Sequence, residues 1–267
     1  MRAAFGLVVL LAFCVTAGAS RAAPRSPFIE DLTWTEVRDA LGAGTTTVII
    51  PVGGTEQSGP HLALGKHNVR VKVLAGRIAT ALGDTLVAPV LAYVPEGNIS
   101  PPTEHMRFPG TISVPVSAFK GTLDGAARSL RQAGFTHIVL IGDHGGYQAQ
   151  LKDVADQLNR AWAGTSARAH YIAAYYRASD VAYTKLLRTQ GLSEAEIGQH
   201  AGAADTSLQL AVDPSTVRSD RLEAAHGADI GVLGDARRSS AVLGQSGVDL
   251  IVNDTVAAIR KARLEKH

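Results

Sequence analysis

Sulfur is nearly absent from this sequence: its 267 residues include a single cysteine, Cys14, and two methionines. Because Cys14 lies in an amino-terminal leader, the chain that follows has no cysteine, and disulfide bonds cannot stabilise its fold. Any metal ion bound there has to be held by nitrogen and oxygen atoms of histidine, aspartate and glutamate. Such ligands suit zinc, manganese, iron or magnesium.

Aromatic residues are also scarce, at 5% of the chain, and the formal net charge is only +2. A surface that stacks bases or sugars needs aromatic side chains, and nucleic-acid binding needs a basic stripe. The sequence shows neither feature, so we exclude nucleic acid as a partner. The hydrophobic fraction of 46% and the charged fraction of 19% are typical of a globular protein with a substantial core.

The first 23 residues have the pattern of a secretory signal peptide. Arg2 precedes an apolar run from Ala3 to Thr16, and Ala17-Gly18-Ala19 offers a small-x-small cleavage pattern. The run is too short to span a bilayer comfortably, although a retained anchor is the alternative. We therefore expect one domain over residues 24–267, periplasmic or secreted, with no membrane attachment after the leader is removed.

Strand-like and helix-like segments alternate along the rest of the chain. Short apolar runs predict strands at residues 48–50, 85–93, 137–141 and 167–175. Apolar residues at helical spacing predict helices at residues 28–43, 69–82, 117–134, 148–163, 179–190, 207–212 and 247–261, the first of them capped by Thr33 or Thr35. This alternation predicts an α/β fold with a mostly parallel sheet covered by helices on both faces.

Metal-capable side chains follow two of the predicted strands. The loop after residues 48–50 carries Glu56, His61 and His67, and the loop after residues 137–141 carries His144. Ligands bind at the carboxyl ends of parallel strands in open α/β sheets. A later loop adds His200 and Asp205. A catalytic metal site needs about three such ligands and one position for water, so the sequence predicts a sulfur-free metal site at this edge.

Four sequence blocks resemble the signature blocks of the creatininase family of metal-dependent amidohydrolases. They are GGTEQSGPHLALGKH, HMRFPGTIS, GDHGG and HAGAADTS, in the same order as in the family, and the resemblance covers roughly Ile29 to Arg260. It implies a three-layer α/β/α fold, a homo-oligomer that is often a hexamer, and hydrolysis of a cyclic or linear amide at a divalent metal pair. Zinc is the first expectation for the metal, with manganese or iron as alternatives.

The resemblance also implies roles for single residues. Glu56 and His144 match metal ligands, Asp205 takes the place of a glutamate that is a ligand in some members, and His200 matches a histidine linked to proton transfer. Two positions depart from the family pattern: Ser58 replaces a histidine ligand, and His67 replaces the bridging aspartate. Since one imidazole nitrogen cannot bridge two ions as a carboxylate does, we expect one retained metal rather than two.

Several further side chains are predicted to line the site. His200 and Glu104 are assigned catalytic roles, and His105, His61 and Tyr147 are assigned substrate binding. Glu104 and His105 lie in the long loop from Val94 to Pro109, where surface exposure is the alternative reading. His61 is balanced between supporting a ligand and serving as one. Asp143 either orients His144 or caps the following helix.

The sequence thus predicts a metal-dependent amidohydrolase that cleaves a carbon-nitrogen bond of a small, creatinine-like amide with water as the nucleophile. Two alternatives remain open. One is a non-catalytic protein that binds a small molecule or a metal in the same pocket, with a degenerate second metal site. The other is a structural oligomer whose site is empty.

Overall fold

A four-stranded parallel sheet forms the centre of the computed structural model, which describes residues 24–265. The strand order is β2-β1-β3-β4, with β1 at Thr47–Val52, β2 at Thr85–Val87, β3 at His137–Gly142 and β4 at Arg168–Tyr171. Strand β1 pairs with β3 over its whole length, from Thr47 opposite His137 to Val52 opposite Gly142. The prediction of a parallel α/β sheet is confirmed. The predicted signal peptide, residues 1–23, lies outside the described residues.

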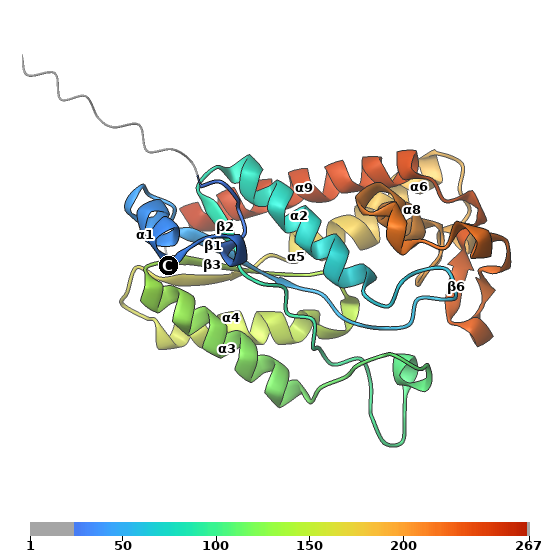
Figure 1. Ribbon diagram of the computed structural model, residues 1–267, viewed down its shortest axis with the longest axis horizontal. Helices are drawn as coiled ribbons and strands as arrows, with labels where there is room; N and C mark the ends of the chain where they lie inside the picture. Colours follow the sequence, from blue (N-terminus) through green and yellow to red (C-terminus); the bar gives the residue numbers. More distant parts are fainter. Residues whose placement is uncertain (1–23, 266–267) are drawn as a thin grey trace, which may run out of the picture.

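Helices cover both faces of this sheet, which makes three layers (Figure 1). Helices α3, Val116–Ala133, and α4, Gln148–Ala161, lie on one face. The opposite face is covered by the following helices: α2 at Lys66–Leu82, α5 at Ala173–Arg177, α8 at Ala203–Val212 and α9 at Ala241–Leu264. Helix α1, Trp34–Gly42, is capped by Thr33 in a capping box with Glu36, as its sequence predicts.

The two central strands are buried on both faces, and their alternate residues enter different cores. Val48 and Ile50 of β1 join the cluster beneath α3 and α4, whereas Ile49 joins the cluster beneath α2 and α9. Successive side chains of a strand point to opposite faces, so a continuous apolar run is what a sheet covered on both sides requires.

Several predicted boundaries are wrong, and one of them changes the site. The helices expected at residues 207–212 and 247–261 span Ala203–Val212 and Ala241–Leu264. Helix α2 begins at Lys66 rather than at residue 69, which places Lys66 and His67 in its first turn. The strand expected at residues 85–93 ends at Val87. The strand expected at residues 167–175 ends at Tyr171, because the chain turns there into a helical run formed by α5, a π-helical turn at Ala178–Ala182 and α6 at Tyr183–Thr189.

A smaller layer of irregular structure closes the carboxyl edge of the sheet. It contains the short helix α7, Glu194–Ile197, and a two-stranded sheet of β5, His226–Gly227, and β6, Val232–Asp235. The long loop after β2 carries a single 3-10 turn, Glu104–Arg107, and extends away from the body of the molecule in Figure 1. Within residues 24–265, no helix combines the length and the apolar character that a bilayer crossing requires.

Candidate metal centre

Glu56 is the centre of the candidate site. It follows β1, its side chain is fully buried, and two imidazoles face its two oxygens: Nε2 of His67 lies 2.8 Å from Oε1, and Nε2 of His144 lies 3.2 Å from Oε2. His67 comes from the first turn of α2, and His144 follows β3 after Asp143. Ligand atoms of all three residues lie within 4.8 Å of one another. The structure therefore brings the three principal predicted ligands together at the predicted edge.

The charge state of Glu56 suits a cation. Burial alone would raise the pKa of its carboxyl group, but His67, His144 and Lys66 hold that pKa well below its usual value. Its Oε2 atom is buried and has no hydrogen-bond partner of good geometry among the described residues. A buried carboxylate oxygen without a partner is costly, and a bound cation would relieve that cost. The residues present thus fit a metal ion held by Glu56, His67 and His144.

A second carboxylate fixes the orientation of His67. Nδ1 of His67 lies 2.6 Å from Oδ2 of Asp143, so this nitrogen donates its proton to the carboxylate and Nε2 faces Glu56. Burial and Lys66 oppose a charged imidazole, yet Glu56 and Asp143 raise the pKa of His67. A carboxylate behind a histidine is the usual arrangement at metal sites, where it sets the tautomer and the ring orientation. Asp143 therefore supports His67, whereas the sequence suggested His144 or a helix cap.

Arg70 joins this cluster, although the sequence gave no reason to single it out. Its Nε donates to Asp143 at 2.8 Å and its NH1 donates to Asp205 at 2.9 Å, while the hydroxyl of Tyr175 donates to Asp143 at 2.7 Å. Arg70 lies one helical turn after His67 on α2, and this spacing is the one signal that would have pointed to it. The arginine and the tyrosine hold Asp143 in place, and through it they hold His67.

The structure pairs Asp205, which the sequence predicts as a possible metal ligand, with cations and a backbone N–H. Its Oδ2 accepts from Nζ of Lys66 at 2.9 Å and from the backbone N–H of Ala201 at 3.0 Å, and its Oδ1 accepts from Arg70. Burial would raise its pKa, but Lys66 and Arg70 hold that pKa well below its usual value. Both oxygens of Asp205 are thus engaged by cations, and Asp205 belongs to neither of the two groups of described residues that could hold a metal ion.

His105 and His200 form a second group around the same carboxylate. Nε2 of His105 lies 3.1 Å from Oε2 of Glu56, and Nδ1 of His200 lies 3.7 Å from Oε1. Their other ring nitrogens lie 3.0 and 3.1 Å from the side-chain nitrogen of Gln57. Glu56, His105 and His200 also satisfy the distance requirement for a metal site. The sequence predicted both histidines at the site but assigned neither of them as a ligand, and it missed Gln57.

The two predicted catalytic residues occupy different environments. Burial and Lys66 lower the pKa of His200 to about 3, so its imidazole is neutral at pH 7. Its Nε2 donates to the backbone carbonyl of Gln57 at 2.9 Å, which leaves Nδ1 without a proton. Glu104 is exposed at the first position of its 3-10 turn and is not among the residues that line the cavity beside Glu56. The predicted catalytic role of Glu104 therefore has no contact with the cavity behind it, although the charge of Glu104 contributes to the raised pKa of the neighbouring Glu96.

The substrate-binding roles predicted for Tyr147 and His61 do not fit their burial. Tyr147 is fully buried, and its hydroxyl lies 2.6 Å from the carbonyl of Gly53 and 2.9 Å from that of Val52, joining the ends of β1 and β3. His61 is also fully buried, with Nε2 2.9 Å from the hydroxyl of Thr206. Both side chains stabilise loops behind the site, whereas His105 lines the cavity as predicted.

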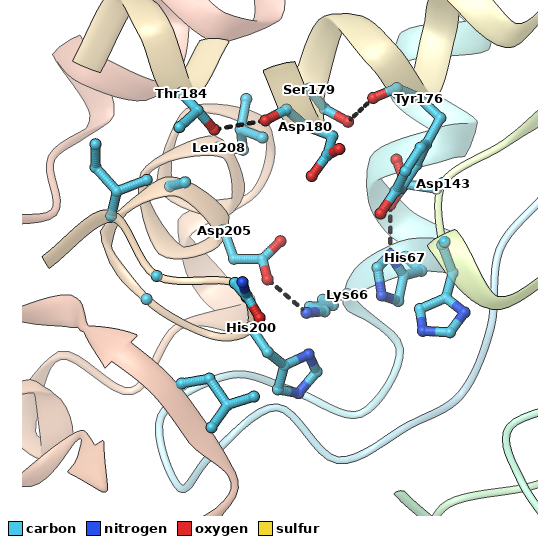
Figure 2. A pocket seen from close by; sticks show the side chains of 18 of the residues that line it. Lys66, His67, Asp143, Tyr176, Ser179, Asp180, Thr184, His200, Asp205 and Leu208 are labelled. Carbon is cyan, nitrogen blue, oxygen red and sulfur yellow. Dashed lines mark hydrogen bonds and ion pairs between the residues drawn. The ribbon is translucent and has the colours of Figure 1, made fainter. Parts of the chain in front are cut away.

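A cavity of about 570 Å³ opens beside this cluster. Figure 2 shows Lys66 and Asp205 directed toward one another across its floor, with His67 and His200 on the same side and Asp180 on the opposite wall. The wall formed by α6 and α7 also carries Arg188 and Glu194. The cavity is lined mainly by charged and polar side chains, so it suits a polar substrate more than an apolar one.

Glu96 makes the free energy of unfolding depend on pH, and this dependence can be measured in metal-free protein. Its carboxyl group is 2% exposed, and burial together with Glu56 raises its pKa to about 9 from the usual 4.5. Between these values the folded chain keeps a proton that the unfolded chain releases, so the folded state loses stability as the pH rises. Glu96→Gln should flatten this loss and raise the free energy of unfolding at pH 8 by about 1–3 kcal/mol.

Urea unfolding between pH 5 and 9 in the presence of a chelator tests this expectation. The exposed Glu223 provides a matched control, because Glu223→Gln should leave the pH profile unchanged. A Glu96→Gln profile that is as steep as that of the wild-type protein would contradict the burial of a neutral carboxyl group.

The fold and the cluster together define a class of protein. A buried carboxylate surrounded by imidazoles, at the carboxyl edge of a parallel sheet and beside a polar cavity, is typical of α/β hydrolases that use a metal ion. Comparison with known proteins agrees with this class. The profile of the family described as "Creatininase: Creatinine amidohydrolase" matches residues 30–259, and the chain therefore belongs to the creatininase family.

Two characterised relatives are about equally similar in sequence. The mycofactocin precursor peptide peptidase of Mycolicibacterium smegmatis is 28% identical over 231 residues, covering 81% of this chain and 82% of the relative. The creatinine amidohydrolase of Pseudomonas putida is 28% identical over 201 residues, covering 74% and 76%. One relative is thus named for a peptide and the other for a small cyclic amide.

Solved structures agree with the sequence comparison. A structure titled "Creatininase Mn" has a TM-score of 0.73 and 26% identity, covering 90% of this chain and 100% of its own. A mutant creatininase described as "Zn-Zn type" has a TM-score of 0.74 at the same identity and coverage. The three-layer creatininase fold implied by the sequence blocks is thereby confirmed.

Proposed function

We propose that this protein is a metal-dependent amidohydrolase that cleaves a carbon-nitrogen bond of a small cyclic or linear amide, with water as the nucleophile. The observation that carries the proposal is the buried carboxylate of Glu56 between His67 and His144, beside a polar cavity. Zinc is the metal we favour, with manganese or iron as alternatives. When bound, such an ion lowers the pKa of a water molecule toward about 7 and polarises the scissile carbonyl.

The protein's own side chains have distinct tasks in this proposal. Glu56, His67 and His144 would hold the ion, and Asp143 keeps Nε2 of His67 directed toward Glu56. His200 is neutral and presents Nδ1 toward Glu56. We assign to His200 the acceptance of a proton from the attacking water and its return to the leaving nitrogen. His105 forms part of the wall that the substrate contacts.

A short peptide is the second candidate substrate. The cavity of about 570 Å³ is also lined by Asp180, Arg188 and Glu194. Charged groups beyond the metal-capable residues suit the polar backbone or the termini of a peptide. The peptidase among the relatives supports the same idea. The leader pattern at residues 1–23 supports export, and the family resemblance supports a homo-oligomer, which we retain as proposals.

Elemental analysis followed by a substrate panel tests the proposed function. The purified protein should contain a divalent metal and should hydrolyse at least one of creatinine, other lactams, formamides or short peptides. A chelator should abolish the activity, and added zinc or manganese should restore it. His144→Ala should lose both metal and activity. His137→Ala, at the other end of β3, is the matched control and should retain them.

The possible outcomes separate the proposal from its alternatives. Bound metal without turnover of any substrate would favour the non-catalytic binding protein. A protein without metal, in which His144→Ala alters neither thermal stability nor metal content, would favour the structural oligomer and would contradict the proposal.

A further inference from the structure

One continuous helical run forms the wall of the cavity that lies across from Lys66 and Asp205 (Figure 2). The run consists of α5, the π-helical turn at Ala178–Ala182 and the helix α6. Its buried residues pack into the core beneath α2 and α9: Tyr175, Ala178, Tyr183 and Leu187. Residues at a spacing of four line the cavity instead: Tyr176, Asp180, Thr184 and Arg188. A bound substrate therefore meets the polar face of this run.

The π-helical turn keeps these four positions on one side of the run. Residues four apart drift by about 40° around an α-helix, because one turn takes about 3.6 residues. Asp180 is the middle residue of the π-helical turn, in which each turn takes more residues. This wider turn reverses part of the drift between Tyr176 and Thr184. Such turns are frequent at functional sites, which agrees with a wall that contacts a ligand.

Asp180 carries the one lining carboxylate that has no ion-pair partner among residues 24–265. The other three are each engaged by a cation: Asp205 by Lys66, Asp143 by Arg70 and Glu194 by Arg188. The carboxylate of Asp180 points into the cavity in Figure 2, whereas its backbone carbonyl accepts from the hydroxyl of Thr184. The wall thus offers a free negative charge to a molecule that enters the cavity.

Tyr176 connects this wall to the metal-capable cluster. A Cβ atom built on Gly145 would lie 2.6 Å from the Tyr176 hydroxyl, so the hydroxyl lies against the loop that carries His144. Burial raises the pKa of Tyr176 to about 12, and the charges of Asp180 and Asp205 contribute to the same shift. The charge of Asp180 therefore acts on the space between the wall and the cluster, where a substrate has to lie.

The two sides of the cavity differ in charge, and this difference can orient a substrate. One side holds the candidate metal centre, where the carbonyl oxygen of an amide would be polarised. The other side holds the free carboxylate of Asp180, which attracts a cation. A substrate with a positive charge away from its scissile carbonyl suits both sides.

We propose that Asp180 binds a protonated amine of the substrate, so that this protein acts on amides that carry a cationic group. The ammonium group would donate to the Asp180 carboxylate. The amino terminus of a short peptide and a lysine-like side chain both offer this chemistry. The inference rests on the proposed function, because it names the substrate class of the same cavity, but it makes a separate prediction about binding.

Calorimetric titrations with three probes test the inference. L-alanyl-L-alaninamide has a cationic amino terminus, N-acetyl-L-alanyl-L-alaninamide is neutral, and N-acetyl-L-lysinamide has its ammonium group on the side chain. A chelator prevents hydrolysis during the titration, and the metal-loaded protein is titrated in parallel. The wild-type protein should bind at least one cationic probe about tenfold more tightly than the neutral probe, because hydrogen bonds between ionised groups are the stronger ones. The preferred cationic probe distinguishes an amino terminus from a side-chain amine.

Asp180→Asn should remove this preference, so that cationic and neutral probes bind within about twofold of each other. Asp180→Glu keeps the charge and should keep the preference. Asp220 provides the matched control, because it is an exposed aspartate that does not line the cavity, and Asp220→Asn should match the wild-type protein. For a cationic substrate from the panel, Asp180→Asn should raise KM about tenfold and leave kcat nearly unchanged.

Equal binding of the cationic and neutral probes by the wild-type protein, or binding of none of them, would overturn the inference even if Asp180→Asn failed to fold. A folded Asp180→Asn variant with an undiminished preference would also overturn it. Neither result concerns metal content or hydrolysis, so the proposed function would stand. Absence of metal and of turnover would instead refute the proposed function, while the titrations would still show whether Asp180 binds amines.

Discussion

Glu56→Gln is expected to abolish metal binding and hydrolysis together. Glu56 is the one residue common to both groups of metal-capable side chains among residues 24–265, and four imidazoles and one ammonium group face its two oxygens. An amide of the same size has no negative charge to offer an ion. Loss of several kcal/mol of charge stabilisation corresponds to roughly a 10³-fold decrease in kcat/KM.

Zinc content and kcat/KM on whichever substrate the panel identifies provide the measurement. Glu104→Gln is the matched control, because the sequence predicts a catalytic role for Glu104 but this residue is exposed in the structure. It should change kcat/KM less than about twofold, since it contacts neither the ion nor the cavity. Retention of both zinc and activity by Glu56→Gln would remove the basis of the proposed metal centre.

Asp143→Ala is expected to produce the largest loss of stability. Asp143 is 4% exposed and accepts hydrogen bonds from Arg70, His67 and Tyr175. Its removal leaves Arg70, which is 3% exposed, with a single carboxylate partner. Breaking a buried ion pair from one side costs about 3–5 kcal/mol, which corresponds to roughly 10 °C in Tm for a domain of this size.

The same substitution should weaken the binding of zinc by about 10- to 100-fold, because His67 loses the group that orients it. Thermal unfolding of the apo protein measures the loss of stability by itself. A zinc titration of the folded variant measures the loss of metal affinity. Asp153→Ala is the control: Asp153 forms an exposed ion pair with Lys120, and its removal should cost less than about 1 kcal/mol. Equal losses of stability for the two variants would show that the buried network contributes little.

The stability due to Asp143 should also depend on pH. Burial would raise the pKa of this carboxyl group, but Arg70 and His67 hold it below its usual value of 3.8. A lowered pKa means that the contribution is fully present above about pH 4 and is lost as the pH falls through the folded-state value. The difference in unfolding free energy between the wild-type protein and Asp143→Ala should therefore shrink under acidic conditions.

Local patterns predicted the scaffold of the site correctly. The apolar run of β1 needs a sheet that is covered on both faces, and Val48 and Ile49 indeed enter different cores. Glu56 and His144 each follow a predicted strand, which placed both at one edge of a parallel sheet, and the pairing of β1 with β3 in the structure brings them together. The start of α2 was placed three residues too late, because the chain around Lys66 and His67 lacks the apolar periodicity that marks a helix.

The partners of the buried charges could not be predicted in this way. Asp205 resembles a ligand in the sequence, but in the structure two cations engage it, one of which is the unpredicted Arg70. Tyr147 follows a glycine-rich loop, as substrate-binding residues often do. Its hydroxyl, however, hydrogen-bonds to backbone carbonyls of β1 and of the loop after it. These assignments depend on contacts between distant segments, and no local pattern encodes them.

The sequence by itself determined the chemistry available to this protein: a parallel α/β sheet, ligands without sulfur, and a cluster of carboxylate and imidazole groups at one edge. The tertiary structure decided which of those groups meet. His67 and Asp143 are 76 positions apart, and Gln57 and His200 are 143 positions apart, yet each pair lies within hydrogen-bonding distance. The physical reason is that a buried charge is stable only beside a partner, and the packing of α2 against the sheet and of α8 against α2 determines which partner that is.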